Sequence, residues 1–118
     1  MFSVFEYLYR DASNFKAWGA LLLAGKASTS DRANIRAALE SGEFFIAEQL
    51  GIPSLYDGLW KLSAGPSKDD HVWHSFHALR DPTEQEQLLP VWGTTRDMVS
   101  RFTAVTQWNE ELSPHWEI

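Results

Sequence analysis

The densest group of polar side chains that could do chemistry lies at 69–77, where three histidines and two aspartates fall within nine residues. Neutral imidazole and carboxylate groups are common ligands of zinc, manganese and iron. The segment therefore suggests a site for one divalent metal, with Asp70, His71 and His74 as the candidate ligands. The catalytic function that follows is a metal-dependent or small-molecule enzyme that uses the Asp69–His74 segment.

The secondary structure of this segment decides whether its histidines can meet. Its valine, tryptophan and phenylalanine content favours a strand over 71–79. On a strand, His71 and His77 share one face but lie about 20 Å apart, and His74 faces the other way with Phe76. A helix would instead make His74 a neighbour of both. A strand therefore favours an alternative without a metal site, in which one histidine is partly buried and hydrogen-bonded and the others are exposed to solvent.

Three glutamates, Glu40, Glu43 and Glu48, offer a carboxylate pair for acid–base work, although such spacing also arises by chance. The pair Glu48–Gln49 stands between apolar residues and would need hydrogen-bond partners if buried, which favours a structural network there. The sequence contains no Gly-x-Ser-x-Gly, Walker or Gly-x-Gly-x-x-Gly motif. We therefore assign no catalytic residue and no cofactor, with one divalent metal as the alternative.

Aromatic residues are abundant, at 14% of the chain, with six tryptophans. Most of these rings are expected in the core, and two or three Trp or Tyr side chains are expected at the surface, where they would anchor a partner. Arg10, which stands beside Asp11, and Lys16 across the first turn place two cations on one face of the hairpin. They suggest an anion contact, with an ordinary exposed ion pair worth under about 1 kcal/mol as the simpler alternative. The candidate binding residues are Tyr9, Arg10, Asp11, Trp18, Glu43, Glu48 and Trp73.

The charge balance limits the class of partner. Sixteen acidic residues against ten basic ones give a formal net charge of −6. The basic residues are dispersed, whereas nucleic acids and anionic membranes require clustered positive charge, so neither is expected as a partner. A basic protein partner fits this charge, because complementary potentials speed encounter. Moderate acidity that only maintains solubility is the simpler explanation.

Length and composition predict one domain over 1–112 with a loose tail at 113–118. The absence of cysteine excludes disulfides and Cys-ligated zinc. The longest apolar run, 20–24, is much shorter than the roughly 20 residues of a membrane span, and the first residues lack the basic segment of a secretory signal. A cytoplasmic location is the expectation.

Local patterns predict an α+β fold with a small, mostly antiparallel sheet that starts with an N-terminal hairpin and has its helices packed on one face. Gly42 is expected to end the first helix, and Gly19 to mark a bulge or a close backbone approach. The predicted elements are strands at 3–10 and 15–23 joined by a turn at 11–14, a helix at 30–41, a strand at 43–46, a helix from Pro53 to Leu62, a strand at 71–79, one helical turn within 81–90 and a helix from Thr94 to Trp108.

Three segments carry a resemblance to known proteins. They are Tyr-Arg-Asp-Ala-Ser-Asn-Phe-Lys-x-Trp-Gly at 9–19, Gly-Glu-Phe-Phe-Ile-Ala-Glu-Gln-Leu-Gly-Ile-Pro at 42–53 and Asp-Asp-His-x-Trp-His-x-Phe at 69–76. Over about residues 4–80 the chain resembles a group of small bacterial proteins that have no reaction or ligand attached to them. The resemblance implies a bacterial, cytoplasmic origin and brings no activity with it.

Three functions follow from these observations. The first is a small acidic protein-interaction module of immunity, antitoxin or adaptor type, without catalytic activity. The second is the enzyme of the Asp69–His74 segment. The third is a structural homo-oligomer, a homodimer for example, that associates through a sheet edge or an exposed tryptophan.

Overall fold

The computed structural model describes residues 1–10, 16–55 and 73–109. Strands β1 (Phe2–Arg10) and β2 (Lys16–Ala24) pair antiparallel along their whole length, which confirms the predicted hairpin. Gly19 lies opposite Tyr7, and a Cβ atom at Gly19 would stand 2.8 Å from Cε1 of Tyr7 and 2.9 Å from Cδ2 of Leu55. The close approach predicted at this glycine is therefore confirmed. The predicted turn at 11–14 lies outside the described residues.

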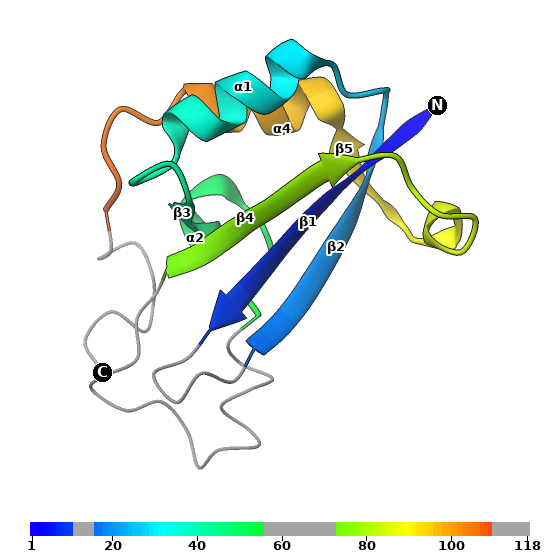
Figure 1. The fold of residues 1–118 in the computed structure, drawn as a ribbon, viewed down its shortest axis with the longest axis horizontal. Coiled ribbons are helices and arrows are strands. Elements are labelled where there is room, and N and C mark those ends of the chain that lie inside the picture. Colours follow the sequence, from blue (N-terminus) through cyan, green and yellow to red (C-terminus); the bar gives the residue numbers. More distant parts are fainter. Residues whose placement is uncertain (11–15, 56–72, 110–118) are drawn as a thin grey trace.

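Three shorter strands complete a five-stranded sheet of order β3-β4-β1-β2-β5 (Figure 1). Strand β4 (Trp73–Arg80) pairs antiparallel with β1 and with β3 (Phe44–Ile46), whereas β5 (Val91–Thr94) runs parallel to β2. The predicted strand at 43–46 is confirmed, and so is the described part of the one at 71–79. Strand β5 was not predicted, because four residues that follow a proline and include a glycine show no alternation.

Two helices cover one face of this sheet. Helix α1 (Thr29–Ala38) begins after Ser28, whose hydroxyl accepts a hydrogen bond from the Asp31 N–H while the Asp31 carboxylate accepts one from the Ser28 N–H. Helix α4 (Thr95–Thr103) begins after Thr94, whose hydroxyl accepts from the Asp97 N–H. These caps confirm the predicted helix starts. Two shorter pieces, α2 (Ala47–Leu50) and the 3₁₀ turn η1 (Glu86–Leu88), complete the described helical structure.

The predicted helix ends are wrong. Helix α1 stops at Ala38, not at residue 41, because Leu39 is extended and Glu40 pairs with Phe44 around a tight turn. Gly42 belongs to that turn, with a φ of 72°, and does not cap the helix. Helix α4 stops at Thr103, short of Trp108. Threonine and valine, which are poor helix formers, are frequent at 103–106, and the indole N–H of Trp108 donates to the carbonyl of Ala38 in α1.

The predicted helix at 53–62 is wrong in its described part, since Pro53 to Leu55 are not helical. Pro53 follows a helix instead of starting one. Helix α2 ends at Gly51, whose left-handed φ of 71° allows the Ile52 N–H to reach the carbonyl of Ala47 at 3.0 Å. A glycine cap with a proline two residues later is a stop signal. Residues 56–62 lie outside the described part of the chain.

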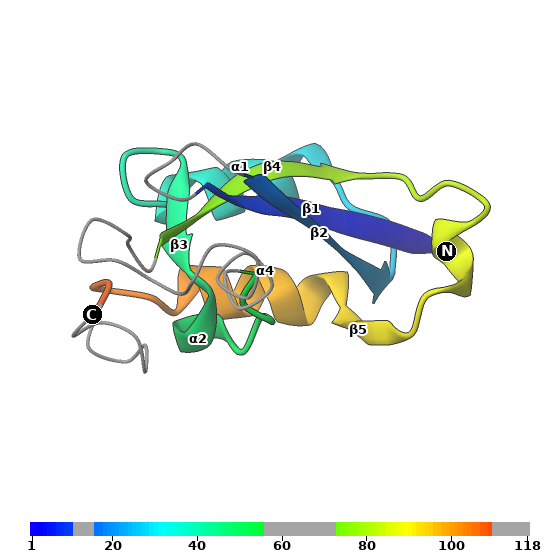
Figure 2. The same cartoon turned by 90° about the horizontal axis from the view of Figure 1, so that it is seen from below.

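The hydrophobic core lies between the sheet and the two helices, whose ribbons are seen from below in Figure 2. A β-bulge contributes to it, because the pairing of β4 with β1 skips His77 and so brings both Phe76 and Leu79 to the core face. The α+β class with helices packed against a mostly antiparallel sheet is thus confirmed. None of the described helices has the length and apolar content needed to cross a membrane. Among the described residues, the largest fully buried apolar and aromatic side chains are Tyr7, Tyr9, Phe5, Phe45, Phe102, Leu22, Leu23, Ile35, Ile46 and Met98.

Candidate binding site

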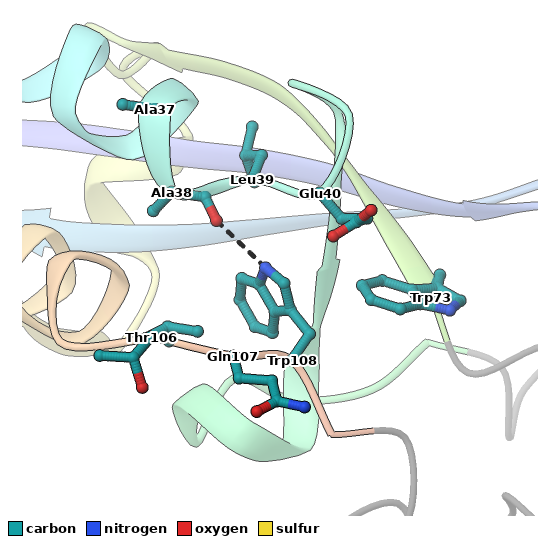
Figure 3. A pocket seen from close by; sticks show the side chains of 9 residues that line it. Ala37, Ala38, Leu39, Glu40, Trp73, Thr106, Gln107 and Trp108 are labelled. Atoms are coloured by element: carbon teal, nitrogen blue, oxygen red, sulfur yellow. Dashed lines mark hydrogen bonds between the residues drawn. The ribbon is translucent and has the colours of Figure 1, made fainter.

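A surface hollow of about 530 Å³ opens where helix α1 ends and strand β4 begins (Figure 3). Two tryptophan side chains and one carboxylate stand around it, together with small and polar residues from the segment after α4. We call it the Trp73–Trp108 hollow. Its lining residues are Ala37, Ala38, Leu39, Glu40, Trp73, Val105, Thr106, Gln107 and Trp108.

Trp108 is fixed from two sides. Its indole N–H donates a 3.1 Å hydrogen bond to the carbonyl of Ala38, the last residue of α1. Its ring also meets that of Phe102 edge-on, with centroids 6.5 Å apart. Because the N–H is used and one contact is with the core, the ring is held in one orientation at the wall of the hollow.

The side chain of Gln49 holds the backbone on both sides of this tryptophan. Its amide nitrogen donates to the carbonyl of Gln107 at 3.0 Å, and its amide oxygen accepts from the N–H of Asn109 at 2.9 Å. A single side chain of α2 thus fixes the residues before and after Trp108. The structural network predicted at Glu48–Gln49 is present at Gln49, and it positions a residue of the hollow.

Trp73 forms the facing wall. It is the first residue of β4, where it pairs with Ile46 of β3, and it is half-buried. Its ring stands edge-on to that of Trp108, with centroids 6.1 Å apart and an interplanar angle of 69°. Two tryptophans more than thirty residues apart in sequence therefore border one opening.

Glu40 supplies the charge. Its backbone exchanges two hydrogen bonds with Phe44, of 2.8 and 2.9 Å, which fixes the residue just past the end of α1. The side chain is exposed, and Figure 3 shows its carboxylate above the gap between the two indole rings. Among the described residues that line the hollow, Glu40 is the one with a charged side chain.

The other predicted binding residues lie elsewhere. Glu43 is exposed in the turn beside Glu40 but does not line the hollow. Trp18 is exposed on β2, 54% accessible, and packs edge-on against His77 with centroids 5.0 Å apart. Tyr9 is fully buried against His74, so its side chain belongs to the core and does not form a surface anchor. Glu48 is half-buried on α2.

The predicted pair of cations on the hairpin is confirmed by the register, which places Arg10 directly opposite Lys16. Both side chains are exposed at the end of the two strands. The third member of that group, Asp11, lies outside the described residues, so the anion contact stays a prediction.

His74 is the described member of the predicted metal site, and its surroundings are those of a core residue. It is fully buried among the rings of Tyr7, Tyr9 and Phe45, and its Nε2 accepts a 3.0 Å hydrogen bond from the N–H of Leu55. That lone pair is therefore engaged and cannot also ligate a metal ion.

The remaining predicted ligands, Asp70 and His71, lie outside the described residues. Within the described ranges there is no group of three or more His, Cys, Asp or Glu side chains that could hold a metal ion. The predicted alternation is confirmed over 74–77, where His74 and Phe76 are buried whereas His77 is exposed, and the bulge at His77 interrupts it before Leu79.

Sequence reasoning identified Trp73 but missed the role of Trp108, which was expected to finish a helix. The excess of tryptophan was the available signal, and it did not say which rings would meet. The contact with Ala38 spans 70 residues, and no local pattern encodes such a pairing. Glu40 was considered for acid–base chemistry, whereas the structure places it beside aromatic rings.

Comparison with known proteins gives no match to a protein-family model, to a curated protein or to a solved structure.

Proposed function

We propose that this chain is a small acidic protein-interaction module of the immunity, antitoxin or adaptor type, that it is non-catalytic, and that its partner docks over the Trp73–Trp108 hollow. The observation that supports the proposal most is the pair of positioned tryptophans at a surface opening. Tryptophan is the residue most enriched among those that dominate binding energy at protein interfaces. A ring that is already fixed loses little conformational entropy when a partner binds.

The proposed place of action is the cytoplasm, and the proposed source is bacterial. The cysteine-free composition and the net charge of −6 support the first, since neither a disulfide nor a membrane-binding charge pattern is present in the sequence. The resemblance at the three segments named above supports the second.

Site-specific crosslinking tests the proposal. A photoreactive benzoylphenylalanine replaces Thr106, an exposed residue of the hollow, in cells that make the protein at its natural level. A control chain carries the same group at Glu84, which is exposed in the connection between β4 and β5 and does not line the hollow. We expect one discrete adduct from position 106, none from position 84, and loss of the adduct when Trp73→Ala is added.

A binding measurement with the captured protein then tests whether the adduct reflects a specific interaction. The captured protein, once purified, should bind the unmodified chain in calorimetry and bind the Trp73→Ala variant at least about tenfold more weakly. An adduct that survives Trp73→Ala, or equal adducts from both positions, would overturn the proposal. An adduct of twice the chain's own mass would replace it with the homo-oligomer.

A further inference from the structure

We propose that the Trp73–Trp108 hollow recognises a basic side chain, a lysine or an arginine presented by the protein partner. This inference rests on the proposed function and names the chemistry of the group that the hollow takes. Three independent features of the described residues lead to it: the aromatic walls, the carboxylate at the rim and the end of helix α1.

The aromatic walls favour a cation. The face of an indole ring carries negative electrostatic potential, and tryptophan attracts ammonium and guanidinium groups more strongly than other aromatic residues do. Trp73 and Trp108 stand edge-on to each other at 6.1 Å, so their ring planes differ by 69° and border two sides of one opening. Since the Trp108 N–H is bonded to Ala38, its ring carries no polar edge into the opening.

Among the described residues, the rim carries one negative charge and no positive one. Glu40 lies on the side of the hollow between the two rings, and the other described lining residues are neutral. No ion pair involving Glu40 is formed among the described residues. An entering ammonium or guanidinium group would thus meet both a carboxylate and the aromatic walls.

The backbone at the C-terminal end of α1 adds to the negative electrostatic potential of the hollow. Ala37, Ala38 and Leu39 line the hollow, so it lies at the C-terminal end of a ten-residue helix. The last carbonyls of a helix carry a partial negative charge equivalent to about half an electron, which stabilises cations placed beside them. An anion at the same place would be repelled by the helix end and by Glu40 alike.

The net charge of the whole chain also favours a positively charged partner. A net charge of −6 draws a positively charged partner into encounter. A basic residue at the centre of that partner's surface, with its alkyl stem packed against the indole rings and its charge at Glu40, fits both the apolar walls and the polar rim.

Titration with short peptides tests the inference on the full chain. The probe is an end-capped Gly-Ser-Lys-Ser-Gly peptide, and its control carries N-acetyl-lysine, which keeps the stem and removes the charge. The readout is the pair of indole N–H resonances of Trp73 and Trp108. We expect the lysine peptide to shift both resonances saturably, and the acetylated one to bind at least about tenfold more weakly.

Matched variants locate the charge effect. Glu40→Gln should weaken the lysine peptide about threefold and leave the acetylated peptide unchanged. Glu43→Gln removes the same charge from the same turn, outside the hollow, and should change neither. Trp73→Leu keeps an apolar wall without a ring and should reduce the preference for the charged peptide. The backbone spectrum of each variant reports whether it is folded.

Three outcomes would overturn the inference. They are equal binding of both peptides, equal effects of Glu40→Gln and Glu43→Gln, and tighter binding of a free polyamine such as spermidine than of the lysine peptide. Failure here is distinguishable from failure of the proposed function. A Trp73-dependent adduct at position 106 combined with silent peptide titrations would leave the interaction module in place and remove only the basic side chain.

Discussion

The hydroxyl of Tyr7 donates a 2.6 Å hydrogen bond to the carbonyl of Pro53, across 46 residues of sequence. Tyr7 lies in the middle of β1, and its burial raises the pKa of the phenol well above its ordinary value. The phenol therefore stays protonated and acts as a donor. Through this bond the central strand holds the segment that leaves α2 and crosses the core face of the hairpin.

Tyr7→Phe removes this donor with almost no change in volume. The carbonyl of Pro53 then loses its partner in a partly buried place, so we expect the free energy of unfolding to fall by about 1–2 kcal/mol. Amide hydrogen exchange should accelerate at Ile52 and Leu55 more than in β1. Urea unfolding and exchange by NMR measure the two effects. Unchanged stability with unchanged exchange at 52–55 would contradict the assignment.

Gly19 faces the same tyrosine, and Gly19→Ala tests how closely the segments pack. An added Cβ would stand 2.8 Å from Cε1 of Tyr7 and 2.9 Å from Cδ2 of Leu55, so both side chains must move. Alanine normally stabilises a strand relative to glycine. We expect a loss of about 1–3 kcal/mol instead, because of overpacking. Unfolding experiments, with chemical shifts of Tyr7 and Leu55, give the measurement.

Gly42→Ala is the matched control for that variant. Its Cβ would meet no atom within 4 Å, but its φ is 72°. The expected cost is about 1 kcal/mol, from the backbone conformation alone, with shift changes confined to the turn around 40–44. If Gly42→Ala cost as much as Gly19→Ala and perturbed the core equally, steric crowding would not explain the Gly19 result.

The hairpin and both long helix starts were predictable from sequence because their causes are local. Alternating apolar residues specify a strand, and the side chains of Ser28 and Thr94 bond within three residues of their own position. The bulge at His77 was not predictable. It follows from the pairing with β1, which no pattern in β4 itself encodes.

The candidate site was less predictable than the fold. Helix α1 ends just before Glu40, whose backbone pairs with that of Phe44. Trp108 lies beyond the end of α4, where its indole N–H donates to the carbonyl of Ala38. Each contact depends on how distant segments come together, so composition indicated surplus tryptophans without their location. His74 shows the converse: its neighbours in sequence suggested a metal, and its neighbours in space are aromatic rings.

The Arg80–Glu86 ion pair predicts a pH dependence of stability. The guanidinium of Arg80 donates two hydrogen bonds to the Glu86 carboxylate, at 2.7 and 2.8 Å. These bonds first, and then one from the Thr83 N–H, lower the pKa of Glu86 to about 2. A carboxyl whose folded pKa is depressed stabilises the fold above its unfolded pKa, and the contribution is lost as the pH falls through about 2.

Glu86→Gln should therefore destabilise the protein at pH 7, by an amount that shrinks as the pH is lowered from about 5 toward 2. Urea unfolding of both proteins at several pH values measures this difference. Glu84→Gln removes the same charge from the same connection, where no described bond reaches Arg80, and should follow the wild type. A stability difference for Glu86→Gln that is constant over this range would contradict the depressed pKa.

His74→Phe tests the second bond that holds the 52–55 segment. It keeps a ring of similar size among Tyr7, Tyr9 and Phe45 but removes Nε2, which leaves the N–H of Leu55 without its acceptor. We expect a loss of about 1–3 kcal/mol in the free energy of unfolding, which is the cost of an unsatisfied buried donor.

Because Tyr7 and His74 hold residues two positions apart, releasing either one loosens the attachment of the other. The variant with both Tyr7→Phe and His74→Phe should then lose less than the sum of the two single losses, by about 0.5 kcal/mol or more. A double-mutant cycle by urea unfolding measures this coupling, and strict additivity would show that the two bonds hold the segment independently.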